Sequence, residues 1–107
     1  MHENRSVITH SMAISGDINV DTDLIIEGAV SANRIDSKNH TVVIGQYSAI
    51  NGDIYGAQIL VLGNITGNLF ASEKVDIRST AVINGDVNAP VIRMEEKARL
   101  NGRLNYT

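Results

Sequence analysis

Apolar and polar residues alternate along most of the chain, in short runs separated by turns. Residues 92–94 alternate with period two, and the alternation resumes over 98–104 after the turn at 95–97. Such alternation is typical of β-strands that bury one face. No spacing of three and four residues persists, and the single proline, Pro90, lies between two runs. The pattern therefore predicts an all-β chain without helices.

The same spacing of mostly apolar residues recurs in three segments of the chain. The residues that align are Val42, Ile44, Ser48, Ile50 and Ile54; Val75, Ile77, Ala81, Ile83 and Val87; and Ile92, Met94, Ala98, Leu100 and Leu104. Each set is interrupted by a three-residue turn, at Gly45-Gln46-Tyr47, Arg78-Ser79-Thr80 or Glu95-Glu96-Lys97. The unit around Leu60-Val61-Leu62 lacks this turn, so we expect a tighter coil there.

Glycines mark the same repeat. The pattern aliphatic-x-Gly-x-aliphatic recurs around Gly16, Gly28, Gly52, Gly67, Gly85 and Gly102, at spacings of 12, 24, 15, 18 and 17 residues. We interpret these glycines as bends, with the neighbouring Asn and Asp side chains bonded to the backbone. The wide gap predicts a loop at residues 37–40.

A coil of about 17 residues cannot bury its inner face alone, so successive coils must stack in parallel, about 4.8 Å apart. The repeat therefore predicts a parallel β-helix, or solenoid, of about six coils. We place this domain at residues 12–107, after a flexible N-terminal tail at residues 1–11.

A β-helix leaves apolar side chains and unpaired backbone groups at both ends. The sequence shows no amphipathic cap after the last coil, which predicts that further copies of the chain cover the ends. The residues expected at these contacts are Ile14 and Ile18 at one end, and Leu100 and Leu104 at the other, with Tyr106 adjacent. A monomer capped by its own tail is the alternative.

Composition narrows the function classes. The formal net charge is −3 without a basic run, which argues against nucleic-acid binding. Cysteine is absent, so no disulfide or thiol chemistry is available. No secretory signal and no run of 18 apolar residues is present. A cytoplasmic protein is the default expectation.

The residues give little support for catalysis, and no cofactor is predicted. The strongest enzyme alternative is a left-handed β-helix acyltransferase, but period six is not kept and His40, in a polar loop, is the only interior histidine. Asp17, Asp21 and Asp23 could hold a cation weakly, although a solvated strand face accounts for them as well. Tyr47, Tyr55, Phe70 and Tyr106 are too scattered for a base-stacking platform. Phe70 is expected to pack against the rod.

Four segments, 23–30, 49–54, 60–69 and 81–87, resemble the bactofilins, and the similarity extends over residues 12–104. It implies a right-handed β-helix in a bacterial cytoskeletal scaffold that polymerises end to end, without nucleotide, into non-polar filaments. It also implies recruitment of cell-wall or morphogenesis proteins at the inner face of the membrane. The family's aromatic residue in the last coil corresponds to Leu100 here. The family's apolar membrane-targeting segment has no match in the polar residues 1–6, so membrane contact is not expected from them. A monomeric β-helical adaptor for a partner protein is the alternative.

The two halves of the chain differ in charge. Residues 1–53 hold seven acidic and three basic side chains, whereas residues 54–107 hold five acidic and six basic ones. Oppositely charged ends would favour head-to-tail contact, which opposes non-polar assembly, but screening within about 10 Å weakens the effect.

Overall fold

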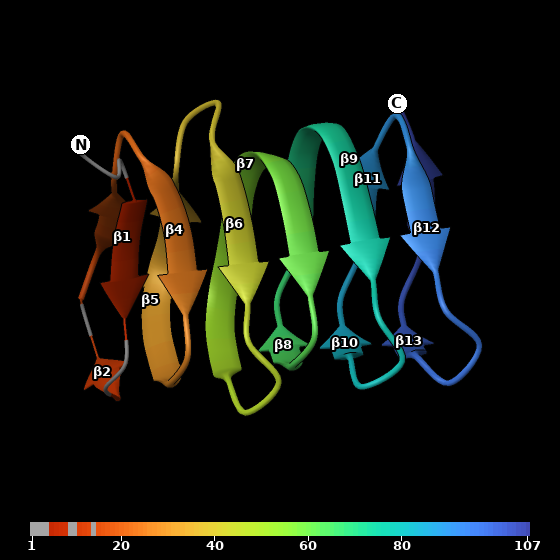
Figure 1. Ribbon diagram of the computed structural model, residues 1–107, viewed down its shortest axis with the longest axis horizontal. Helices are drawn as coiled ribbons and strands as arrows, with labels where there is room; N and C mark the ends of the chain where they lie inside the picture. Colours follow the sequence, from red (N-terminus) through yellow and green to blue (C-terminus); the bar gives the residue numbers. More distant parts are fainter. Residues whose placement is uncertain (1–4, 9–10, 14) are drawn as a thin grey trace.

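The alternating runs fold as strands, and every strand pair among the described residues is parallel. The computed structural model describes residues 5–8, 11–13 and 15–107. They form a solenoid of about six coils within 35 × 25 × 25 Å, with the coils side by side from the N-terminal to the C-terminal end (Figure 1). In this part of the chain no helix is present that could span a membrane. The parallel solenoid is confirmed, and its right-handed sense stays a prediction.

Each coil contributes strands to three faces. Face 1 contains β1 (Arg5–Ile8), β4 (Asp23–Ile26), β6 (Thr41–Ile44), the end of β7 (Ala49–Val61), the end of β9 (Leu69–Ile77) and β12 (Ile92–Met94). Face 2 contains β2 (Met12–Ala13), the start of β5 (Ala29–Asp36), the start of β7, β8 (Asn64–Thr66), β10 (Val82–Asn84) and β13 (Arg99–Asn101). Face 3 contains β3 (Asp17–Asn19), the end of β5, the middle of β7, the start of β9, β11 (Val87–Ala89) and β14 (Leu104–Tyr106).

The core is a set of rows, each made of one inward position from successive coils. The predicted alignment is confirmed, because Val75 pairs with Ile92, Ile83 with Leu100 and Val87 with Leu104. Most inward aliphatic side chains of coils two to five are inaccessible to solvent. Stacking similar aliphatics in this way excludes water from a narrow interior without large aromatic residues.

The predicted turns lie where the sequence places them. Residues 45–47, 78–80 and 95–97 connect face 1 to face 2, and residues 37–40 form the predicted loop. The fourth coil lacks the three-residue turn and is tighter, since Ile50 pairs with Ile65 only 15 residues later. The prediction of one shorter coil is thus confirmed.

The corner between faces 2 and 3 brings two backbones very close. At Gly67 φ is +143°, and an added Cβ would lie 2.1 Å from the carbonyl oxygen of Gly52 in the coil before. The residue after each corner glycine links the coils, because Asp53 Oδ1 accepts the Asn68 N–H at 3.0 Å and Asn68 Oδ1 accepts the Asp86 N–H at 2.9 Å. The predicted bonding of Asn and Asp to the corner backbone is confirmed.

Gly28 does not belong to this corner, although the sequence pattern groups it there. It directly precedes face 2, and its carbonyl accepts the Ala49 N–H at 3.2 Å. In the second coil the corner is formed by Ala32 and Asn33, whose N–H donates to Gly16 at 2.8 Å. The spacings of 12 and 24 residues therefore combine two different corners.

The solenoid also begins earlier than expected. Residues 5–8 fall within the predicted tail, yet they form β1, which pairs with β4 from Arg5↔Asp23 to Ile8↔Ile26. This pairing places the start of the domain before residue 12. Polar residues at the start of this strand hide its alternation in the sequence.

Replacing Gly67 with alanine should be strongly destabilising, because the new Cβ meets a carbonyl and the backbone is in a region that only glycine adopts readily. We expect the free energy of unfolding to fall by more than about 3 kcal/mol. Gly16 is the matched control, with φ +133° and nothing within 4 Å of an added Cβ. Urea unfolding should show a loss of only about 1–2 kcal/mol for Gly16→Ala, and equal losses would contradict the close-contact argument.

Candidate polymer interface at the ends of the solenoid

The C-terminal end carries the last member of each inward row, and all of these side chains except Ala98 are partly or largely exposed. Ile92, Met94, Ala98, Leu100, Leu104 and Tyr106 lie over Val75, Ile77, Ala81, Ile83, Val87 and Ala89, respectively. Each residue of the last coil occupies the same position in its row as the residue beneath it in the fifth coil, but no described coil covers it. Met94 is 42% exposed and Tyr106 is 66% exposed, whereas Ile77 and Ala89 beneath them are fully buried.

The backbone at this end is uncovered as well. In the part of the chain that the structure describes, β12, β13 and β14 each pair with the preceding coil, and no strand follows them. An apolar layer bordered by free strand edges is a template for pairing with another chain. Among the described residues, the C-terminal end therefore combines an apolar layer with free strand edges.

The N-terminal end is formed by β1, β2 and β3. Ile8, Ile18 and Val20 are half-buried and pack against the core from one side. Ile18 pairs with Ile35 of the next coil, so it is the first described member of its inward row. This end thus also presents aliphatic side chains.

The predicted interface residues fall at both ends. Ile18 lies in the first coil, and Leu100, Leu104 and Tyr106 lie together in the last one. Ile14 is outside the described residues. Ile92 and Met94 belong to the same exposed layer and were missed, although the sequence alignment of the rows already contained both.

Charge differs between the two ends. The last coil, residues 92–107, carries four basic side chains, Arg93, Lys97, Arg99 and Arg103, and two acidic ones, Glu95 and Glu96. The first described coil carries one basic residue, Arg5, and two acidic ones, Asp17 and Asp21, and Asp17 lies 3.9 Å from Arg34 of the next coil. The charge difference of the two sequence halves is thus also a difference between the ends of the rod.

The aromatic residues are less scattered than the sequence indicates. Tyr55 and Phe70 are neighbours in one outward row of face 3, and their rings stack with centroids 4.6 Å apart. The Arg34 guanidinium lies over the other side of the Tyr55 ring, at 5.1 Å. Phe70 packs against the rod as predicted, whereas the expected separation of Tyr55 and Phe70 is wrong because they occupy adjacent coils.

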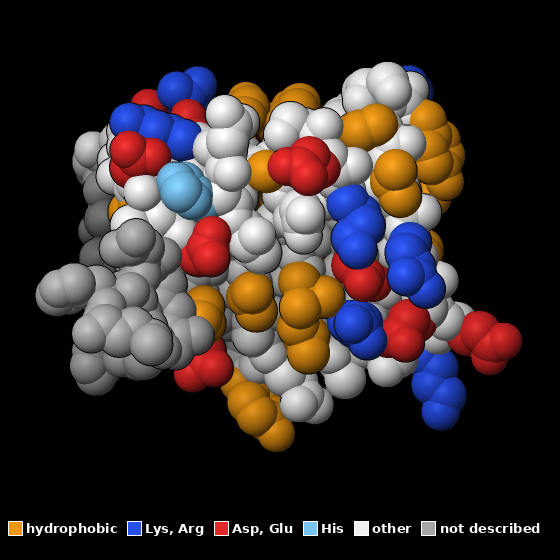
Figure 2. All heavy atoms as spheres, turned by 45° about the horizontal axis from the view of Figure 1, so that its top comes forward, with side chains coloured by type: hydrophobic (Ala, Val, Ile, Leu, Met, Phe, Trp, Pro, Cys, Tyr) orange, Lys and Arg blue, Asp and Glu red, His pale blue; other side chains and the backbone are white. Residues whose placement is uncertain are grey.

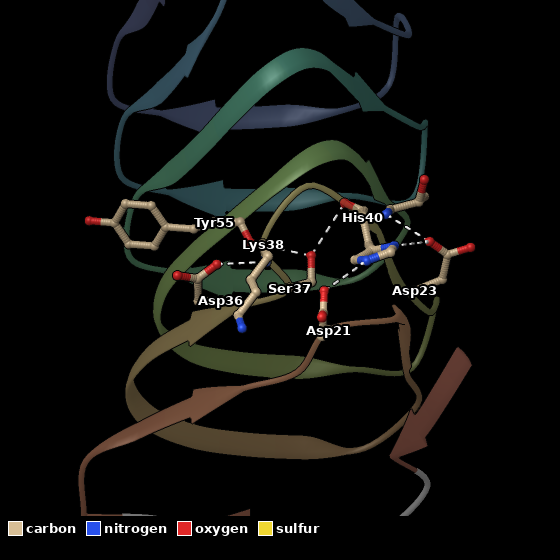
Figure 3. Close-up of polar contacts among 8 residues, drawn as sticks. Asp21, Asp23, Asp36, Ser37, Lys38, His40 and Tyr55 are labelled. Atoms are coloured by element: carbon tan, nitrogen blue, oxygen red, sulfur yellow. Dashed lines mark hydrogen bonds and ion pairs between the residues drawn. The ribbon is translucent and has the colours of Figure 1, made fainter. Parts of the chain in front are cut away.

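His40 has specific partners rather than solvent alone. Its Nε2 lies 3.1 Å from Asp21 Oδ1, and its Nδ1 lies 3.6 Å from Asp23 Oδ1 (Figure 3). The Ser37 hydroxyl donates to the His40 carbonyl at 3.3 Å, which closes the loop. His40 therefore joins this loop to the previous coil. No group of three or more His, Cys, Asp or Glu among the described residues is arranged to hold a metal ion.

The comparisons with known proteins agree with this geometry. A model of the bactofilins, described as polymer-forming cytoskeletal proteins, matches residues 6–105. The chain belongs to the bactofilin family. Bactofilin BacO of Myxococcus xanthus (strain DK1622) is 33% identical over 100 residues, covering 94% of this chain and 78% of that protein. Bactofilin BacP of the same strain is 26% identical over 102 residues, covering 95% of this chain and 42% of that protein. No solved structure matches the chain significantly.

Leu69 and Leu104 test whether this bactofilin has an open end, because they belong to one inward row but differ in coverage. Leu69 is fully buried and Leu104 is 37% exposed. At low protein concentration we expect Leu69→Ala to reduce the free energy of unfolding by about 2–5 kcal/mol and Leu104→Ala by less than about 1.5 kcal/mol. Equal losses in chemical denaturation would mean that Leu104 is already covered in the single chain.

Proposed function

We propose that this chain is a bacterial cytoskeletal scaffold whose rods join end to end, without nucleotide, into non-polar filaments. The uncovered apolar layer of the last coil carries the proposal. In such a filament like ends meet, so the layer around Leu100, Leu104 and Tyr106 contacts the same layer of a second copy. Membership of a polymer-forming family supports self-association.

The driving force is the burial of the terminal rows. Complete burial of a large aliphatic side chain contributes about 1.5–3 kcal/mol, and Met94, Leu104 and Tyr106 each retain a substantial exposed fraction. Strand edges at the same end gain hydrogen-bond partners in the contact. These contributions require no bound nucleotide, and the sequence contains no Gly-rich phosphate-binding loop that ends in Lys-Ser or Lys-Thr.

A filament of this kind is a rigid surface with many identical outer faces. We propose that it works in the cytoplasm and positions cell-wall or morphogenesis proteins, which would bind the sides of the rods while the ends are occupied. Repetition of one binding site along a filament raises the effective affinity for partners that are themselves clustered. The scaffold role thus follows from the polymer and needs no catalytic group.

Leu100→Arg tests the end contact. The variant would bury an unpaired charge at the joint, at a cost of several kcal/mol, so we expect folded protein that forms no filaments in negative-stain microscopy. Because the contact between N-terminal ends is left intact, the variant should elute as nothing larger than a dimer of the 11.6 kDa chain. Asn101→Arg is the matched control, because Asn101 is the next residue in β13 and is exposed on the outer side.

Leu104→Lys provides a second variant at the same end, in case Leu100→Arg prevents folding. Circular dichroism checks the fold of each variant. Filaments that persist unchanged in both variants would place the joint elsewhere, and a wild-type chain that elutes only as a monomer would indicate the adaptor alternative.

A further inference from the structure

The outer side of face 1 carries apolar residues at its middle. Val43 of β6 and Leu60 of β7 are adjacent in one outward row, and Ile25 of β4 precedes them. All three are half-buried, as is Leu62 beside them. Figure 2 shows hydrophobic side chains gathered at the lower middle of the view, with acidic groups to their left and both basic and acidic groups to their right.

Charged residues border this apolar middle in a regular order. One outward row of face 1 runs from Asp23 in the second coil to Lys74 in the fifth, through Thr41 and Gln58. A second row runs from Glu27 in the second coil to Arg78 in the fifth, through Gly45 and Leu62; this order follows the backbone bonds that extend each ladder. Between the second and the fifth coil each row therefore runs from an acid to a base. Arg5 precedes Asp23 in the first row, and Glu95 follows Arg78 in the second.

This order makes face 1 complementary to itself. A two-fold axis that lies parallel to the strands, between the third and fourth coils, places the second coil of one copy opposite the fifth coil of the other. Asp23 then faces Lys74 of the second copy, and Glu27 faces Arg78 of the second copy. Val43 faces Leu60 of the second copy at the centre. In such an isologous contact, both copies use the same set of residues, and each interaction occurs twice.

We infer that face 1 is a lateral contact at which two rods pack antiparallel. A parallel pair would bring Asp23 against Glu27 and Lys74 against Arg78 of the second copy, which is repulsive. Ile25 lies opposite Asp76 in the antiparallel pair, and the Asp76 carboxylate is already within 3.6 Å of Arg78 Nε in its own chain. Exposed ion pairs are weak individually, so the contact gains strength from its repetition along a filament.

Cysteine cross-linking tests the orientation, because the chain has no cysteine of its own. Glu27 and Arg78 are three coils apart, about 14 Å, too far for a disulfide within one chain or across either end contact, since a disulfide needs Cβ atoms about 4 Å apart. We expect a mixture of Glu27→Cys and Arg78→Cys chains to form disulfide heterodimers under mild oxidation, and neither variant alone to do so. Homodimers of Glu27→Cys, or no cross-link in the mixture, would overturn the inference.

Exchanging the charges of Glu27 and Arg78 tests whether ion pairs between the two rods stabilise the lateral contact. Glu27→Arg or Arg78→Glu should place like charges opposite each other and separate paired filaments into single ones in cryo-electron microscopy. The double variant Glu27→Arg/Arg78→Glu should restore the pairs. Thr66→Arg, on the exposed side of face 2, is the control and should leave pairing unchanged. If the double variant stays as impaired as the single ones, or if no variant changes pairing, the inference is wrong.

These tests separate the lateral contact from the end contact. Filament length reports the ends, whereas pairing reports face 1, so the charge variants should keep the wild-type length. The cross-linking result can also be obtained with Leu100→Arg chains that do not elongate. Loss of filaments in all face 1 charge variants would overturn the assignment of this face to lateral contact alone.

Discussion

The spacing between coils, about 4.8 Å, is the constraint on which the rest of the structure depends. Every inward side chain must pack on the equivalent side chain of the next coil, and every backbone group must find its partner there. The corner at Gly52, Gly67 and Gly85 shows how strict this requirement is, because no Cβ fits against the carbonyl of the previous coil. A corner that could not approach so closely would separate the rows and admit water.

The same constraint is the reason why we propose that the ends self-associate. Leu104 belongs to the same inward row as Leu69 but is 37% exposed, so a contact between two rods would bury the same kind of side chain that stacking of coils buries within one rod. In the proposed assembly, burial of apolar side chains thus stabilises the contact between rods, as it stabilises the stacking of coils within one rod. The outward rows are not constrained in this way, since their side chains do not fill the interior. The outward rows can therefore vary in charge and polarity, and in the proposals above they form the contacts on the sides of the rod.

The sequence predicted the features that follow from periodicity. The register of Val75 with Ile92, the three-residue turns and the short fourth coil depend on spacing alone, and the structure confirms them. Gly28 was assigned to the wrong corner because glycine serves two corners for different reasons. The Tyr55–Phe70 stack and the His40 contacts depend on which residues occupy neighbouring coils, which a list of motifs does not show. Of the end layer, Leu100 and Leu104 were found by asking which row members lack a cover, and Ile92 and Met94 answer the same question.

The charge difference along the rod has opposite consequences for its ends and for its sides. Contacts between like ends bring charges of one sign together, and the four basic residues of the last coil oppose such a contact electrostatically, so burial of the apolar layer must exceed that repulsion. On face 1 the same gradient becomes attractive as soon as two rods lie antiparallel, because the acids of the second coil meet the bases of the fifth. Antiparallel pairing also gives the assembly no net direction, whatever the order of rods within each filament. The charge difference between the ends thus disfavours the proposed contact between like ends and favours the proposed lateral contact.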